Sequence, residues 1–241
     1  MVNGELVLTQ DGPIATLVIS NPAKRNAMTA AMWRALPSLL EAPAKDPSVR
    51  ALILAGAGGT FCAGADITEA ASLARAGDAS LAVRAEQALA AFPKPTIARI
   101  DGFCVGGGCQ LAVACDLRFA ASDSRFGITP AKLGIVYPPS TTRRLASLIG
   151  PARAKLLLYT ADLFDAAAAE RMGLVDAVFP PADLASSVLQ VASTIASRSQ
   201  LTQRATKAVL SGSEPPPQDE AELSEGIAAF LSRRPPAFPW S

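Results

Sequence analysis

The 241-residue sequence contains no histidine. This absence excludes a Ser-His-Asp or Cys-His nucleophile arrangement and any metal site built on histidine ligands. Proton transfer, if the protein catalyses any, must use Asp, Glu, Tyr, Lys, Cys or water. We therefore expect a site that contains no metal ion.

An excess of charge of one sign is also lacking, as are long hydrophobic runs. The 22 basic and 21 acidic residues leave a net charge of +1, so nothing points to nucleic acid or to an anionic membrane as a partner. No apolar run reaches the length of a membrane span, and the opening MVNGELVLTQ lacks the pattern of a signal peptide. We expect a cytoplasmic protein.

The cysteines are few, and none is spaced as C-x-x-C. We expect buried, reduced thiols at all four positions, with only the first lying beside a candidate site: Cys62, Cys104, Cys109 and Cys115. The chain length suits one α/β domain, or such a domain with a small helical appendage. We place the core at residues 1–182 and the appendage at 183–241.

The hydrophobic pattern predicts strands that alternate with helices. Strands are expected at 6–8, 15–19, 51–55, 96–100 and 117–120, with an edge strand within 173–179. Helices are expected from Thr29 towards Leu40, at 140–149, 152–161 and 165–172, and again beyond Asp183. Pro37 should kink the first helix or end it early, and a Ser/Gly/Pro break is expected at 211–217.

The stretch KPTIARIDGFCVGGGCQLAVACDLRFA, from Lys94 to Ala120, is the most informative part of the chain. It predicts a strand, a turn, three glycines and then an apolar helix from Cys109. Glycines allow close approach of a bound group, and the first turn of a helix has unpaired N–H groups. The combination suits a developing oxyanion, although a tight turn whose glycines only ease packing gives the same pattern.

A second glycine-rich junction follows the strand at 51–55, with the sequence GAGGTFCAGADITEA leading into a helical segment. Two strand–loop–helix junctions can each offer one N–H group to the same oxygen. An oxyanion hole with two donors needs this arrangement.

Four segments in this order resemble the crotonase (enoyl-CoA hydratase/isomerase) superfamily: Pro22–Met28, Phe61–Ile67, Gly102–Gln110 and Gly226–Leu231. The resemblance implies an α/β fold with a crotonase-like ββα spiral core and a short helical C-terminal appendage. It also implies a homotrimer or a dimer of trimers.

The same resemblance implies an acyl-CoA thioester substrate, with no cofactor beyond the coenzyme A that belongs to the substrate. The N–H groups of Ala65 and Gly107 are then expected to hold the thioester oxygen. Contacts with coenzyme A are expected from Lys24, Arg25, Ala27, Ala63, Asp66 and Ile67. A solvated turn is the alternative for Lys24 and Arg25, and Asp66 matches the family's structural aspartate.

Hydratases of this family carry two glutamates, and the matching positions here are Gln110 and Pro130. An amide cannot take a proton at neutral pH, and a proline side chain neither donates nor accepts one. Loss of a general acid or base removes a factor of about 10²–10⁴. Ordinary two-glutamate hydration is therefore not expected.

Decarboxylation forms a thioester enolate without a base, and a neutral pocket favours the loss of a carboxylate. The segment from Phe126 to Tyr137 resembles the methylmalonyl-CoA decarboxylase branch, which implies a site role for Tyr137, although that branch has histidine where this chain has Ala65. Gln110 is expected to orient the substrate carboxylate. The alternative for Tyr137 is a structural residue beneath the Pro138-Pro139 turn.

The leading hypothesis is therefore a lyase that decarboxylates malonyl-type CoA esters. One alternative is an enoyl-CoA hydratase or isomerase with a non-standard base such as Glu69, whose simpler interpretation is a solvated helix face. Another is a non-catalytic acyl-CoA binding protein. The pair Arg143-Arg144 is assigned to packing or to a subunit surface.

Overall fold

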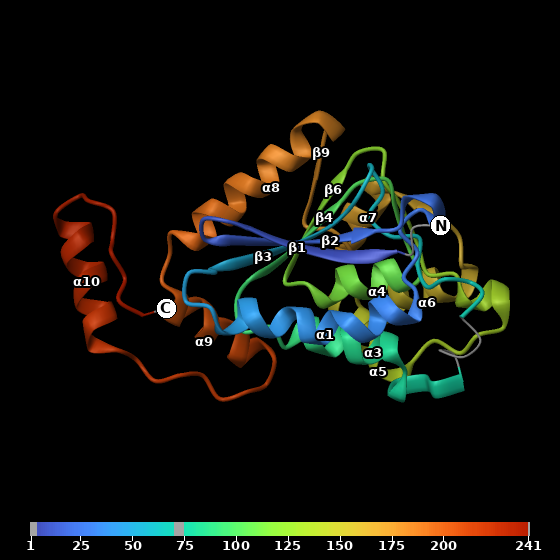
Figure 1. The fold of residues 1–241 in the computed structure, drawn as a ribbon, viewed down its shortest axis with the longest axis horizontal. Coiled ribbons are helices and arrows are strands. Elements are labelled where there is room, and N and C mark those ends of the chain that lie inside the picture. Colours follow the sequence, from blue (N-terminus) through green and yellow to red (C-terminus); the bar gives the residue numbers. More distant parts are fainter. Residues whose placement is uncertain (1–3, 70–74, 241) are drawn as a thin grey trace.

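The computed structural model describes residues 4–69 and 75–240, and it shows a mixed α/β fold (Figure 1). A six-stranded sheet has the order β1-β2-β3-β4-β6-β9. Its strands are β1 (Glu5–Asp11), β2 (Ile14–Ser20), β3 (Ala51–Gly56), β4 (Thr96–Ile100), β6 (Leu117–Ala121) and β9 (Ala177–Phe179). The predicted α/β class is confirmed.

The first two strands form the predicted hairpin, and every later strand of this sheet runs parallel to its neighbour. The bounds of β4 coincide with those predicted, because its Thr and Ile residues suit a strand covered on both faces. All six residues of β3 are buried.

A second, three-stranded sheet was not predicted from the sequence. It contains β5 (Phe103–Val105), β7 (Arg125–Gly127) and β8 (Phe164–Asp165). These strands have only two or three residues, too few for an alternating pattern to be recognised. Each turn of the spiral thus runs from the large sheet through the small sheet and into a helix, such as α4 (Gly107–Ala114) or α5 (Pro139–Ile149).

Helices cover both faces of the large sheet (Figure 1). On one face lie α1 (Ala30–Lys45), α3 (Leu81–Ala90), α4 and α5, and on the other lies α8 (Pro181–Ala196). Leu184, Val188 and Ala192 of α8 share a core cluster with strand residues such as Ile53 and Ile97. The sequence analysis assigned α8 to the appendage, and in the structure this helix packs on the sheet.

Thr29 caps α1 as predicted, because its hydroxyl accepts a hydrogen bond from Met32 N at 3.3 Å. The expectation that Pro37 could end this helix early is wrong, since α1 continues through Pro37 to Lys45. An interior proline costs a helix about 3 kcal/mol or more. Burial of Trp33, Leu36 and other side chains on the inner face of α1 offsets that cost.

The remaining elements are η1 (Pro22–Lys24), η2 (Gly77–Ala79), η3 (Pro130–Leu133), α6 (Pro151–Thr160), α7 (Ala166–Met172), α9 (Gln200–Leu210) and α10 (Glu220–Leu231). The helical segment expected after the first glycine loop falls partly on residues 70–74, outside the described residues. Among the helices that the structure describes, none is long and apolar enough to cross a membrane.

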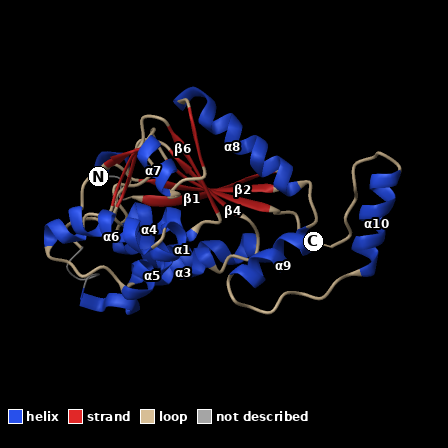
Figure 2. Cartoon of the chain, turned by 180° about the vertical axis from the view of Figure 1, so that it is seen from behind, coloured by secondary structure: helices blue, strands red, loops and turns tan. Residues whose placement is uncertain are grey.

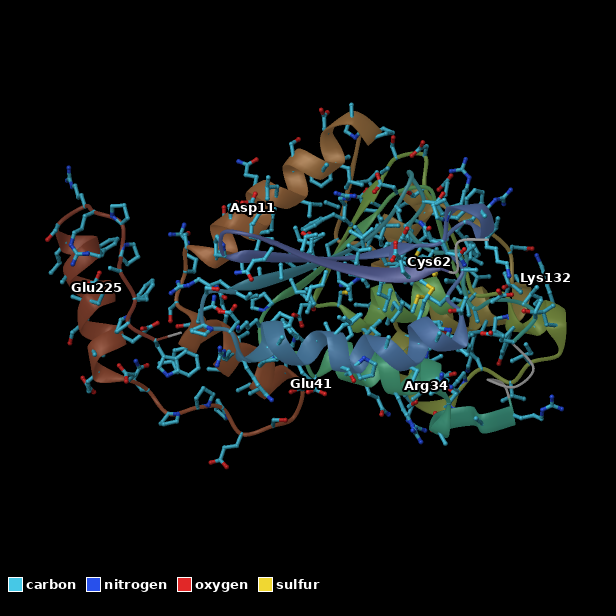
Figure 3. The ribbon with its side chains drawn as sticks, viewed as in Figure 1. Asp11, Arg34, Glu41, Cys62, Lys132 and Glu225 are labelled. Atoms are coloured by element: carbon cyan, nitrogen blue, oxygen red, sulfur yellow. The ribbon has the colours of Figure 1, made fainter. Side chains whose placement is uncertain are left out.

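The predicted break at 211–217 is confirmed, because it separates α9 from α10. Both ribbon views show α10 standing apart from the body of the molecule (Figures 1 and 2). Figure 3 shows Glu225 on this separate helix, whereas Cys62 lies in the interior beside α4.

Candidate active site

The small sheet brings the two glycine-rich loops side by side. Cys62 and Cys104 form a parallel bridge, in which Cys62 N donates to Phe103 O at 2.8 Å and Val105 N donates to Cys62 O at 2.9 Å. Ala65 and Gly107 are each the third residue after this bridge. The pairing register therefore places the two predicted donors at the same level.

The N–H group of Ala65 is left free by the bonds around it. Met28 N donates to Gly64 O at 2.8 Å, and Asp66 N donates to Met28 O at 2.9 Å. In an extended segment the backbone groups of successive residues point to opposite sides. The Ala65 N–H therefore points away from Met28, and no backbone group in the described residues accepts it.

Gly107 is the first residue of α4, so the helix starts earlier than the predicted Cys109. Its N–H has no partner within the helix, as is usual for a first turn. A Cβ atom at this position would lie 2.9 Å from Trp33 Cζ2 and 3.3 Å from Ala65 N. Only glycine fits here, and this close approach shows that the two donor loops are neighbours.

Both loops line a cavity of about 240 Å³, into which the N-terminus of α4 opens. Its walls also include Trp33, Thr129, Pro130 and the segment 135–138. No Asp, Glu, Lys or Arg is among the described residues that line it. The residues outside the described part contain no Asp or Glu in their sequence, so they supply no carboxylate side chain.

Gln110 lines this cavity, and hydrogen bonds to residues outside the cavity lining fix the orientation of its amide. Its Nε2 atom donates to Glu86 Oε2 at 2.8 Å and to Thr141 Oγ1 at 3.1 Å. Because a carboxylate only accepts hydrogen bonds, the NH₂ group must face Glu86. The carbonyl Oε1 is then the atom left for the cavity, an arrangement that does not favour the predicted role of Gln110 in orienting a substrate carboxylate.

Glu86 is a buried carboxylate of α3, 1% exposed, that sequence reasoning missed. It accepts hydrogen bonds from Arg144 Nε at 2.7 Å and from Thr141 Oγ1 at 2.5 Å, besides the one from Gln110. Arg144, which the sequence analysis assigned to packing or to a subunit surface, therefore pairs with this acid. The signal was available, because Glu86 has helical spacing with the buried residues Ala82 and Leu89.

Tyr137 lies where its segment reaches the cavity, next to Pro138. Burial raises the pKa of its phenol well above the usual value, and the nearby Cys109 and Glu86 raise it further. The hydroxyl is therefore protonated at neutral pH. Among the described residues it has no hydrogen-bond partner, so it is free to donate to a bound molecule.

The predicted coenzyme A contacts are divided between the cavity and the surface beside it. Ala63 and Ile67 line the cavity, and Ile67 is 66% exposed. Lys24 Nζ donates to Asp66 Oδ2 at 2.5 Å, and this bond, together with those from Thr68, holds the pKa of Asp66 below its usual value.

Arg25 and Ala27, the other two predicted contacts, follow Lys24 in the chain. The Arg25 guanidinium lies over the Phe103 ring, 5.2 Å from its centroid, and Ala27 is buried. Lys24 and Arg25 are both exposed and lie near the first loop, where a phosphate could reach them.

Glu69 and Cys62 have structural roles near the site. Glu69 accepts a hydrogen bond from Ala30 N at the start of α1, and it is not among the described residues that line the cavity. Burial raises the pKa of the Cys62 thiol to about 12, so this cysteine is a poor nucleophile.

Comparison with known proteins agrees with this geometry. A family model for enoyl-CoA hydratase/isomerase matches residues 9–223. The chain belongs to the enoyl-CoA hydratase/isomerase family. The predicted superfamily and its spiral fold are thereby confirmed, whereas the decarboxylase branch is not shown.

Relatives in this family match over nearly the whole chain. The crotonyl-CoA hydratase of Syntrophomonas wolfei is 35% identical, with 97% of both chains covered, and the 2,3-dehydroadipyl-CoA hydratase of Escherichia coli is 33% identical, with 97% of this chain and 98% of the relative covered. A crystal structure of an enoyl-CoA hydratase/isomerase family protein from Hyphomonas neptunium has a TM-score of 0.89 at 36% identity, with 98% of both chains covered.

Proposed function

We propose that this protein binds an acyl-CoA thioester with its carbonyl oxygen between the N–H groups of Ala65 and Gly107, and that it decarboxylates a malonyl-type acyl group. Two N–H groups without acceptors in the described backbone, on one cavity wall, support the first part. The second part rests on a single observation, the absence of charged side chains from the described cavity lining.

In the proposed reaction the bond between Cα and the carboxylate breaks, and carbon dioxide leaves. The electron pair of that bond becomes the enolate, whose oxygen accepts hydrogen bonds from Ala65 and Gly107. Fixed donors are worth most where the charge develops, because they need no reorganisation. The Tyr137 phenol then protonates Cα and recovers its proton from water.

The neutral lining favours this reaction in two ways. A substrate carboxylate is solvated less well among residues such as Trp33, Ile135 and Val136 than in water, which favours its loss. No described acid in the lining repels it. The Tyr137 hydroxyl is the one described phenol at the cavity, and it can donate a hydrogen bond to the carboxylate before it donates its proton.

Hydration or isomerisation of an enoyl-CoA is the second candidate, and the names of the relatives favour it over decarboxylation. The Gln110 carbonyl is an acceptor that can hold a water molecule. This reaction still needs a base, and Glu86, the buried acid bonded to Gln110, already accepts hydrogen bonds from Gln110, Thr141 and Arg144. Glu69, the base expected for this alternative, accepts from the backbone of α1.

Product analysis by mass spectrometry tests the proposal. The protein is incubated separately with malonyl-CoA, methylmalonyl-CoA and crotonyl-CoA. We expect acetyl-CoA and propionyl-CoA from the first two and little 3-hydroxybutyryl-CoA from the third. Rapid hydration of crotonyl-CoA with no loss of carbon dioxide would establish the second candidate. Tight binding of all three esters without conversion would indicate an acyl-CoA binding protein.

We also propose that the protein assembles as a homotrimer or a dimer of trimers. Apolar side chains of α10 are exposed in the single chain, among them Ile227, Phe230 and Leu231, with Phe230 82% exposed. An exposed apolar patch of this kind favours association. Light scattering that gives the mass of one chain at working concentration would contradict this proposal.

A further inference from the structure

A second cavity lies between the C-terminal end of α3, helix α9 and the last residues of the chain. Its volume is about 670 Å³, and it shares no lining residue with the catalytic cavity. Its apolar wall includes Phe92, Pro93 and Trp240. Three basic side chains also line it: Arg144, Arg204 and Lys207.

Arg204 is the central basic residue of this cavity. Its guanidinium lies over the ring of Trp240, 4.6 Å from the centroid, and no carboxylate of the described residues lies within ion-pair distance. Its Nε atom is buried and has no described acceptor. Burial lowers the pKa of this guanidinium, which shows that the site is poorly solvated. A partly buried guanidinium that has no carboxylate partner favours the binding of an anion.

The other two basic side chains of the lining are already paired with acids. Asp116 accepts from Lys207 Nζ at 2.8 Å, and Glu86 accepts from Arg144 Nε at 2.7 Å. A further cation, Lys94, lies behind the wall, where burial and the neighbouring Arg204 lower its pKa to about 8. Of the three described basic side chains that line the cavity, Arg204 is therefore the one without a carboxylate partner.

We propose that this cavity binds an organic phosphate of the size of a nucleoside monophosphate. The phosphate would be held by Arg204 through charge-assisted hydrogen bonds, with Lys207 and Arg144 adding favourable charge. The hydroxyl group of Ser213, which also lines the cavity, can donate to it. The apolar wall with Trp240 accommodates a flat ring, since aromatic faces stack on one another.

Calorimetric titration with AMP, inorganic phosphate and adenosine at constant ionic strength tests this site. We expect saturable binding of AMP with one site per chain, weaker binding of inorganic phosphate, and no detectable binding of adenosine. Absence of saturable AMP binding, or adenosine binding as tight as that of AMP, would overturn the proposal. Inorganic phosphate that binds as tightly as AMP would also overturn it, because the apolar wall would then contribute nothing.

Variants test whether AMP binds at Arg204. Arg204→Met keeps an apolar side chain of similar length beside Trp240 and should weaken AMP binding roughly 10-fold or more, the loss of a charged partner. Arg84→Met removes one exposed positive charge from α3, outside the cavity, and should leave AMP binding unchanged. Equal affinity in Arg204→Met and the wild type would show that AMP binds elsewhere, and equal losses in both variants would show an effect of net charge alone.

Trp240→Ala provides an independent check at the apolar wall of the cavity. We expect this variant to weaken AMP binding while leaving that of inorganic phosphate within about two-fold, because it removes the stacking face and keeps the cations. An unchanged affinity for AMP in this variant would contradict the proposed position of the ring.

Discussion

The two sides of the catalytic cavity are built by different means. On one side, the donors are the backbone N–H groups of Ala65 and Gly107, which are placed by the small sheet and the start of α4. On the other side, the polar groups are side chains, and the described ones include Ser80, Gln110, Thr129 and Tyr137. The fold fixes the first side whatever the side chains are.

This difference shows why membership of the enoyl-CoA hydratase/isomerase family leaves the reaction open. Backbone donors persist through many substitutions, so a relative at 35% identity shares the fold that holds a thioester. A reaction that needs a general base changes when one or two side chains change. The family resemblance matches Gln110 and Pro130 to the positions of the expected acids, and the oxygens of Glu86 are engaged by Gln110, Thr141 and Arg144.

The largest effect is expected from a substitution that fills the space beside the backbone N–H donors. Gly107→Ala adds a methyl group 3.3 Å from Ala65 N and 2.9 Å from the Trp33 ring, where the thioester oxygen should lie. We expect kcat/KM for the thioester to fall by about 10²–10³, the usual loss for one oxyanion donor. Gly226→Ala is the matched control, because a Cβ atom there meets only Phe238 at 3.4 Å. Equal activity of both variants would place the substrate elsewhere.

The next largest effect is expected from placing an acidic side chain at position 110 of the cavity. Gln110→Glu alone would set two buried carboxylates together, so we expect it to lower stability and decarboxylation. The double variant Glu86→Gln, Gln110→Glu exchanges acid and amide while keeping their hydrogen bond. We expect it to gain crotonyl-CoA hydration by a factor on the order of 10², with decarboxylation reduced by charge repulsion.

Steady-state assays of the wild type, both single variants and the double variant complete this cycle. A double variant that hydrates no faster than the wild type would show that the side-chain side is incomplete for another reason, such as Pro130. A wild type that already hydrates crotonyl-CoA rapidly would show that the cavity has a base that this account overlooks.

A smaller effect is expected at Tyr137. Tyr137→Phe should lower decarboxylation by roughly 10-fold, the loss of one good polar contact. Because the pKa of this phenol is raised, it stays protonated throughout the usual assay range. The wild-type rate should therefore show no loss as the pH rises from 7 to about 9. A fall in rate within that range, absent from Tyr137→Phe, would show that the phenol ionises there.

The smallest effect is expected at Asp66, whose hydrogen bonds stabilise the first glycine-rich loop. The pKa of Asp66 is lowered by its hydrogen bonds from Lys24 and Thr68, so its contribution to stability is present above the ordinary value of 3.8 and is lost as the pH falls through the lower folded value. Asp66→Asn should therefore flatten the loss of stability in acid and change kcat/KM by less than about 3-fold. Chemical denaturation at pH 7 and pH 3 measures this, and the ion pair contributes little because the Lys24 side chain is exposed.

The sequence predicted the parts that repeat a simple pattern. The hairpin, β4 and the two glycine loops follow from alternating hydrophobic residues and from glycines at junctions. The contact between the two glycine loops could not be predicted from periodicity. It depends on the backbone β-bridge between Cys62 and Cys104, beside a sheet whose strands are very short. The resemblance to the family supplied that information.

The environment of Gln110 was beyond sequence reasoning, because it depends on which partner faces its amide. Glu86, Thr141 and Arg144 come from two helices that the spiral packs against α4, and only their contacts fix the amide orientation. The path of α1 through Pro37 was missed for a related reason. Local propensity disfavours proline in a helix, and tertiary packing outweighs it here.

The central claim is that this cavity stabilises an enolate but has no carboxylate to form one by removing a proton. Deuterium incorporation, followed by mass spectrometry in D₂O, tests it most directly. We expect methylmalonyl-CoA to give propionyl-CoA that carries deuterium at Cα, while propionyl-CoA added as substrate gains none. The account would be contradicted if added propionyl-CoA gained deuterium while methylmalonyl-CoA released no carbon dioxide.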